Sequence, residues 1–332
     1  MHDLKFEHLL IAQNRLSPQM GTENVAEFLH QPVSAANQGF ALVGKTLLAL
    51  PFATSVGRLD QFCEDAAAIE VTGTLWKDPK KATPEVHERF LLAKAAASKT
   101  MLGPNNEQSG RVLSLGIENI TQLLRHDGYA VIELNEAVDA TFKSSLVHLY
   151  TTLEVFAADL WVRALNLGPP DLALAVCTNR HTKGKPEEKQ IKLSELSRYG
   201  FDIRQKLGSM LREGEKVSFD SLTKVAKSYR DAFGPMAEPL FETKVNYSAD
   251  VFILGELRNL IVHRASVVDQ RFHDKLTALE PFPATPLSTQ PVGQPFLIDA
   301  TIVERLFNAT FLFCVALLKV VNDAVKVPAE GR

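Results

Sequence analysis

The 332-residue chain has few cysteines, only two tryptophans and no marked excess of charge of either sign. Cys63, Cys177 and Cys314 are far apart, which excludes a CxxC metal or redox pair, and their odd number does not suit a paired disulfide framework. The N-terminus lacks the basic start, the unbroken apolar run and the cleavage site of a signal peptide. We therefore expect a protein of the reducing cytoplasm.

The charge balance excludes a strongly basic nucleic-acid-binding protein. Lys and Arg number 36 against 39 Asp and Glu, so the net charge of -3 gives no global attraction to nucleic acid or to an anionic membrane. Any polyanionic partner must bind a local patch. Hydrophobic residues make up 45% of the chain and charged residues 23%, which is typical of a globular protein and excludes a disordered chain.

Long apolar runs are also scarce. The two longest, 39–57 and 306–321, are at or below the roughly 18–20 apolar residues that a bilayer requires. The first contains Lys45 and Pro51, and the second contains Asn308. We therefore predict buried helices or loops here, and no membrane span.

Alternating apolar and polar residues, the pattern of a β-strand, are almost absent. Apolar residues instead recur at steps of three and four, which predicts an all-α protein. Between residues 137 and 167 this pattern predicts one buried helix face, made of Leu146, Leu149, Leu153, Phe156, Leu160 and Leu165. The one segment that reads as a strand is Tyr129–Leu134. The predicted helices cover residues 4–15, 57–70, 84–101, 111–125, 137–167, 219–233, 248–272 and 299–325, and Ser248 is expected to cap the seventh, with Asp250 near its positive end.

These elements predict a mostly helical N-terminal region of unknown role at residues 1–135, followed by a helical bundle at 136–327. A single continuous helical body is the alternative. Between residues 178 and 216 stand ten Lys or Arg against six Asp or Glu. This polar insertion is a candidate contact surface for a polyanion, or a solvated loop.

A cluster of polar side chains lies within the helix predicted over 248–272. Glu256, Asn259 and His263 share one stripe of that helix, because they are separated by steps of three and four, and Arg258 lies beside them. Arg258 and His263 are five residues apart, which is about 140° around a helix and roughly 7.5 Å along it. For the two to converge, the protein needs a shared cleft, the long reach of an arginine, or a second copy of the helix.

The pattern Arg258-Asn259-x-x-x-His263 resembles the motif of the HEPN superfamily (higher eukaryotes and prokaryotes nucleotide-binding). The resemblance extends to the order of helices from about residue 136 to residue 325, and does not cover the first 135 residues. It implies a helical bundle that acts, as many members do, as a homodimeric, metal-independent endoribonuclease in a toxin–antitoxin or other prokaryotic defence system. Other members only bind RNA or nucleotides. Some members carry a tyrosine two positions after the motif histidine, and a partner nucleotidyltransferase neutralises them by modifying it. This chain has Ala265 at that position, so this mode of neutralisation is not expected.

The residue types suit RNA cleavage by the RNA's own 2′-hydroxyl, which leaves a 2′,3′-cyclic phosphate and needs no metal or cofactor. His263 can exchange a proton near neutral pH, and the Arg258 guanidinium can stabilise a phosphorane-like transition state. Asn259 is expected to orient the phosphate or the imidazole, and Glu154 or Glu256 to hold Arg258. The expected partners are RNA, a second copy of the chain and an antitoxin or another defence protein. Residues that could contact the RNA backbone are Arg264, Lys183, Lys185 and Lys189.

Two other interpretations stay open at this point. In the first, Arg258 forms an ion pair with Glu154 or Glu256 and His263 is hydrogen-bonded at a helix interface, so that the bundle binds RNA, nucleotide or a protein partner without catalysis. In the second, Gly39-x-x-x-x-Gly44-Lys45-Thr46 is a phosphate loop of a nucleotide hydrolase, with Lys45 and Thr46 on the phosphates. That alternative requires a strand before the loop, a helix after it and a parallel sheet.

Overall fold

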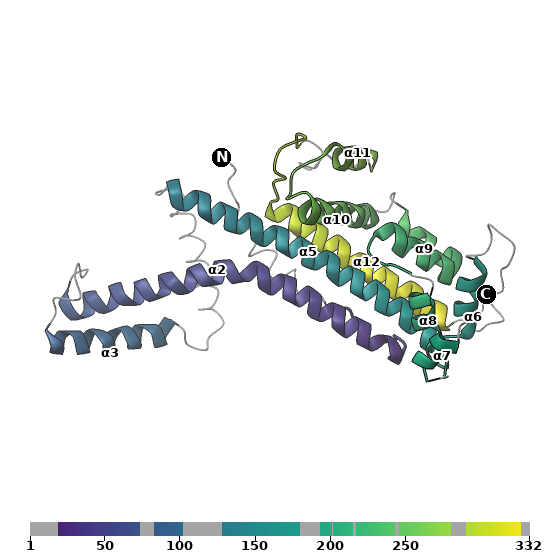
Figure 1. Ribbon diagram of the computed structural model, residues 1–332. Coiled ribbons are helices and arrows are strands. Elements are labelled where there is room, and N and C mark those ends of the chain that lie inside the picture. The colour runs from purple at the N-terminus through teal and green to yellow at the C-terminus, as the bar shows by residue number, and fades with distance from the viewer. Residues whose placement is uncertain are drawn as a thin grey trace. The chain divides into compact units, whose positions relative to one another are not determined.

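Figure 1 shows the computed structural model of the chain, which describes residues 19–73, 83–101, 128–179, 193–200, 202–214, 217–242, 246–279 and 290–326. Within these ranges the regular structure is helical and contains no β-strand; an isolated β-bridge joins Val267 to Pro295. The predicted all-α class is confirmed. The helices predicted over 4–15 and 111–125 lie outside the described residues.

The described helices are α2 (His30–Thr72), α3 (Pro84–Met101), α5 (Gly128–Leu167), α6 (Pro170–Asn179), α7 (Leu193–Arg198), α8 (Leu207–Gly214), α9 (Leu222–Phe233), α10 (Asn246–His263), α11 (Gln270–Ala278) and α12 (Ala300–Lys326). Short 3-10 turns are η1 (Glu27–Leu29), η3 (Gly234–Met236) and η4 (Glu238–Phe241).

The chain divides into two compact units, and α2 and α5 contribute to both. The first unit is built on Lys45–Thr141, and the second on the described residues up to Gly44 and from Phe142 onward. In the first unit, α3 packs against α2 through a small buried cluster of Ala67, Ala68, Phe90 and Ala93. An ion pair of 2.7 Å between Lys94 and Glu64 joins the same two helices.

The second unit has its core along α5 and α12. The buried face predicted for α5 is confirmed, because all six residues of the apolar pattern are buried: Leu146, Leu149, Leu153, Phe156, Leu160 and Leu165. From α2, Phe40 packs edge-on against Phe307 of α12, with ring centroids 5.4 Å apart. Helix α10 also packs on α12. Buried aromatic and aliphatic side chains of α2, α5, α10 and α12 thus form the core of the second unit.

Helix α9 is fixed to α5 by two hydrogen bonds that cross the core. The Trp161 indole nitrogen donates to the carbonyl of Ser228 at 3.0 Å, and the Tyr229 hydroxyl donates to the carbonyl of Ala157 at 2.9 Å. Such bonds satisfy polar groups that burial would otherwise leave without partners. The helix starts at its cap Ser221, whose hydroxyl accepts from the backbone N–H of Lys224.

Three predictions about the first 135 residues are wrong. Tyr129–Leu134 belongs to α5 and not to a strand, because the segment has no Gly or Pro to stop the helix and extending a helix is easier than forming a strand without a partner. Residues 57–70 are not a separate helix, since α2 continues through Pro51. Lys45 and Thr46 also lie inside α2, and the described part of the chain contains no parallel sheet, so the phosphate-loop alternative is wrong.

Helix α12 contains the apolar run 306–321. Among the described residues it is the one helix long and apolar enough to cross a membrane, judged by length and composition, and 56% of the most apolar window is buried inside the protein. Core helices pass the same test. Because Leu306, Phe313, Leu317 and Val321 are buried in the second unit, the prediction of a core helix is confirmed.

Helix α10 is joined to α12 by an ion pair. Arg305 contacts Asp250 at 2.8 Å, and burial raises the pKa of this carboxyl while Arg305 opposes the rise. Ser248 is not the helix cap that the sequence predicts. It lies inside α10, buried, and its hydroxyl donates to the carbonyl of Leu240 at 2.6 Å, because the helix begins earlier, at Asn246.

We expect Gly39→Ala to destabilise the protein. A Cβ at this position would lie 2.6 Å from both Cγ2 and Oγ1 of Thr152, so overpacking of about 1–3 kcal/mol outweighs the roughly 1 kcal/mol of helix propensity that alanine adds. Chemical denaturation measures the difference. The loss should shrink in a Thr152→Ala background, and an equal loss in both backgrounds would contradict the packing explanation.

We expect Arg305→Met to lower the free energy of unfolding by about 2–3 kcal/mol at neutral pH, because it leaves the Asp250 carboxylate buried without its cation. Since burial raises the folded-state pKa of Asp250, the protonated form favours folding. The loss should therefore diminish as pH falls from about 7 to 4. Urea denaturation over this range measures it, with Arg305→Met/Asp250→Asn as the control that should show no such pH dependence.

Candidate functional site

The motif helix α10 ends at the motif histidine. The prediction of one helix over 248–272 is wrong about where that helix ends. Ala265 and Ser266 have positive φ angles of 49° and 64°, which break the helix after His263. The N–H of Ser266 donates back to the carbonyl of Leu260 at 3.1 Å. A new helix, α11, then starts at its cap Asp269. An Asp before a helical turn is a known start signal, so the start of α11 could have been predicted from the sequence.

The segment after α10 is held by a second piece of chain. The N–H of Val268 donates to the carbonyl of Gln294 at 3.0 Å, and the N–H of Phe296 donates to the carbonyl of Ser266 at 2.7 Å. Left-handed conformations of non-glycine residues are strained by about 1–3 kcal/mol each and persist only where surrounding contacts enforce them. These hydrogen bonds supply that enforcement, and they fix where α10 stops and His263 projects.

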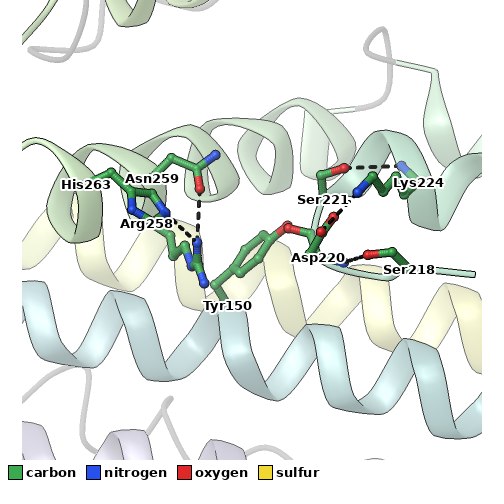
Figure 2. A network of polar contacts seen from close by, with 8 residues as sticks. All are labelled: Tyr150, Ser218, Asp220, Ser221, Lys224, Arg258, Asn259 and His263. Atoms are coloured by element: carbon green, nitrogen blue, oxygen red, sulfur yellow. Dashed lines mark hydrogen bonds and ion pairs between the residues drawn. The ribbon is translucent and has the colours of Figure 1, made fainter. Parts of the chain in front are cut away.

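Figure 2 shows that the Arg258 side chain folds along α10 toward His263. Its Nη1 donates to Oδ1 of Asn259 at 3.2 Å and lies 3.4 Å from Nε2 of His263, a long hydrogen bond. The long reach of the arginine therefore brings together two residues that helix geometry separates. A second copy of the helix is not required for their convergence.

The cluster is open to solvent on one side. His263 is exposed, while Arg258 and Asn259 are half-buried. Within the described ranges Nε and Nη2 of Arg258 have no hydrogen-bond partner, since both contacts of the guanidinium use Nη1. Where Nη1 donates to Nε2, that nitrogen carries no proton, and its lone pair becomes available to a substrate when the guanidinium turns to another acceptor. The site thus presents free guanidinium donors beside an imidazole.

A buried tyrosine lies beneath the guanidinium. Cζ of Arg258 is 6.0 Å from the centroid of the Tyr150 ring, and the Tyr150 hydroxyl donates to the carbonyl of Asp220 at 3.2 Å (Figure 2). Burial raises the pKa of Tyr150 to about 12, so its hydroxyl stays protonated at neutral pH. Sequence reasoning missed this residue. The available signal was its position one helical turn before Glu154, on the same face of α5.

The two acids expected to hold Arg258 differ. Glu256 forms an ion pair with Lys275 of α11 instead. Glu154 has no ion pair within the part of the chain that the structure describes. Burial raises its pKa, and the positive charge of Arg258 is the strongest opposing influence. Glu154 is therefore the acid that faces Arg258 electrostatically, without a direct contact.

The residues expected to contact RNA are only partly described. Arg264 is exposed and lies 3.4 Å from Asp269, and Lys183, Lys185 and Lys189 are outside the described residues. No group of three or more His, Cys, Asp or Glu that could hold a metal ion occurs in the described ranges. A separate hollow of about 430 Å³, lined by Gln31, Asp159, Arg163 and Gln205 among others, contains none of the motif residues.

Comparison with known proteins finds no family model, no curated protein and no solved structure that matches this chain.

We expect Arg258→Met to raise the pKa of Glu154 further, because it removes the cation that most favours the carboxylate. Carboxyl ¹³C NMR measures this titration, with the Glu154 signal identified by its absence in Glu154→Gln. Arg212→Met is the matched control: Arg212 also favours the carboxylate but more weakly, so the rise should be smaller. Equal effects of the two variants would show that Arg258 does not face Glu154.

Proposed function

We propose that the protein is a metal-independent endoribonuclease of HEPN type, with Arg258 and His263 as its catalytic residues and Asn259 as the residue that orients them. The observation that carries the proposal is the guanidinium of Arg258 next to the exposed imidazole of His263, with Nη1 and Nε2 3.4 Å apart. Among the described residues, Nε and Nη2 of Arg258 have no hydrogen-bond partner and can bind an anion. This arrangement supports general acid–base chemistry on a phosphodiester.

In the proposed reaction, Nη1 of Arg258 turns from Nε2 of His263 to the phosphate of the bound RNA. Nε2, released from that contact, removes the proton from the RNA 2′-hydroxyl. The 2′-oxygen attacks the adjacent phosphorus, and the bond between phosphorus and the 5′-oxygen breaks. The free donors of Arg258 neutralise the charge that develops on the non-bridging oxygens. The 5′-oxygen leaves with a proton, and the products are a 2′,3′-cyclic phosphate and a 5′-hydroxyl.

One imidazole cannot accept the first proton and donate the second at the same moment. A homodimer that brings two copies of the site to one RNA resolves this, because the His263 of the second copy, in its protonated form, serves as the acid. Dimerisation thus has a chemical purpose in this proposal, even though a single chain already brings Arg258 and His263 together.

The biological setting follows from the resemblance of Arg258-Asn259-x-x-x-His263 to the HEPN motif. We propose a toxin or effector of a prokaryotic defence system that acts on cellular RNA in the cytoplasm and is restrained by an antitoxin or another defence protein. Arg264 and the lysines at 183, 185 and 189 would contact the RNA backbone. Because Ala265 stands where some members carry a tyrosine, modification of that tyrosine cannot be how this chain is silenced.

We expect the purified protein to cleave cellular RNA in excess EDTA and to leave 2′,3′-cyclic phosphate ends. His263→Ala should lower the cleavage rate by about 10²–10⁴-fold, since it removes the general base. Arg258→Ala should lower it by about 10²–10³-fold, since it removes the transition-state cation. Time courses on a labelled RNA and analysis of the product ends measure both effects.

The matched control is His273→Ala, which removes a half-buried histidine from α11, outside the motif. This variant should cleave like the wild type. RNA binding without cleavage would instead favour the non-catalytic module, and cleavage that survives in both His263→Ala and Arg258→Ala would exclude the proposed site.

A further inference from the structure

We propose that Tyr150 is a positioning residue that sets the place of the Arg258 guanidinium. Its effect on RNA cleavage rests on the proposed function, whereas its effect on the placement of Arg258 does not. Tyr150 comes from α5 and Arg258 from α10, so the contact joins two helices that are distant in sequence.

The ring of Tyr150 lies next to the guanidinium of Arg258. Cζ of Arg258 lies 6.0 Å from the ring centroid, at the outer limit of a cation–π contact, which is attractive because the ring face is electron-rich. Tyr150 is only 3% exposed, so its side chain cannot reach an RNA bound at the exposed edge of His263. Its influence on the reaction must therefore pass through Arg258.

A glycine on the motif helix makes room for this ring. A Cβ at Gly255 would lie 3.2 Å from Cε2 of Tyr150, closer than an ordinary contact. Gly255 precedes Arg258 by three residues and therefore lies on nearly the same face of α10. The absence of a side chain at Gly255 lets the tyrosine ring approach the helix directly below the arginine.

The far end of the ring is tied to the start of α9. The Tyr150 hydroxyl donates to the carbonyl of Asp220 at 3.2 Å, and Asp220 is followed by the helix cap Ser221. The carboxylate of Asp220 also pairs with Lys224 at 3.0 Å, one turn into the helix. Figure 2 shows this connected series, from the start of α9 through Tyr150 to Arg258 and His263.

The decisive experiment compares Tyr150→Leu with Tyr150→Phe. The first removes the aromatic face, and the second keeps it while removing the bond to Asp220. Tyr229→Phe is the matched control, because it removes the same kind of bond, from a buried tyrosine hydroxyl to a backbone carbonyl, without contacting Arg258. Gly255→Ala is an additional variant that displaces the ring without changing the chemical identity of any side chain named in the site.

The first readout needs no RNA. It is the ¹H–¹⁵N signal of Nε of Arg258, which depends on the position of the guanidinium relative to the Tyr150 ring and is identified by its absence in Arg258→Lys. We expect this signal to move in Tyr150→Leu and Gly255→Ala, to move less in Tyr150→Phe, and to stay in place in Tyr229→Phe. The second readout is cleavage. Tyr150→Leu should lower kcat by about 10- to 100-fold with little change in KM, since a misplaced catalytic group weakens transition-state binding only.

An Arg258 signal that is the same in Tyr150→Leu and the wild type would overturn the proposal. So would a signal that moves while kcat stays unchanged, or a kcat that falls equally in Tyr229→Phe. If the wild type cleaves no RNA, the proposed function fails, and the Arg258 signal alone decides whether Tyr150 positions the guanidinium.

Discussion

The packing of α5 against its neighbours is the constraint on which the candidate site depends. One face of α5 is buried from Leu146 to Leu165, and two hydrogen bonds across the core tie it to α9. Because a helix is rigid over a few turns, this packing also fixes where Tyr150 and Glu154 lie along α5 and in which direction their side chains point. The hydrophobic core thereby determines which aromatic ring lies under Arg258 and which carboxyl faces it.

The motif helix is held at both ends by contacts outside the motif. Near its start, Asp250 pairs with Arg305 of α12. Beyond its end, the left-handed residues Ala265 and Ser266 are kept in place by hydrogen bonds to the segment around Gln294 and Phe296. An exposed histidine at the end of a helix would otherwise fray with the last turn. These contacts give His263 a defined position while leaving its ring exposed to solvent.

The electrostatics of the site are organised around one guanidinium. Nη1 of Arg258 is shared between Asn259 and His263, while the half-buried Glu154 faces the same positive charge without a direct ion pair. Glu256, which the sequence places on the same stripe of the helix as Asn259 and His263, forms an ion pair with Lys275. The arginine is therefore not neutralised by a bonded carboxylate among the described residues, and its charge remains directed toward the open side of the site.

The sequence alone determined the all-α class, the buried face of α5 and the core helix over 306–321. It also determined that Arg258, Asn259 and His263 lie on one helix. Helical periodicity and spacing along one helix are local properties, which is why the sequence was sufficient for these features. The sequence did not determine where α10 stops, since the break depends on hydrogen bonds from residues 294–296 to 266–268. It also assigned a strand to 129–134, where continuation of a neighbouring helix prevailed. The choice between Glu154 and Glu256, and the presence of Tyr150 beneath the guanidinium, were decided only by tertiary structure, because both depend on how α5, α10 and α11 pack against one another.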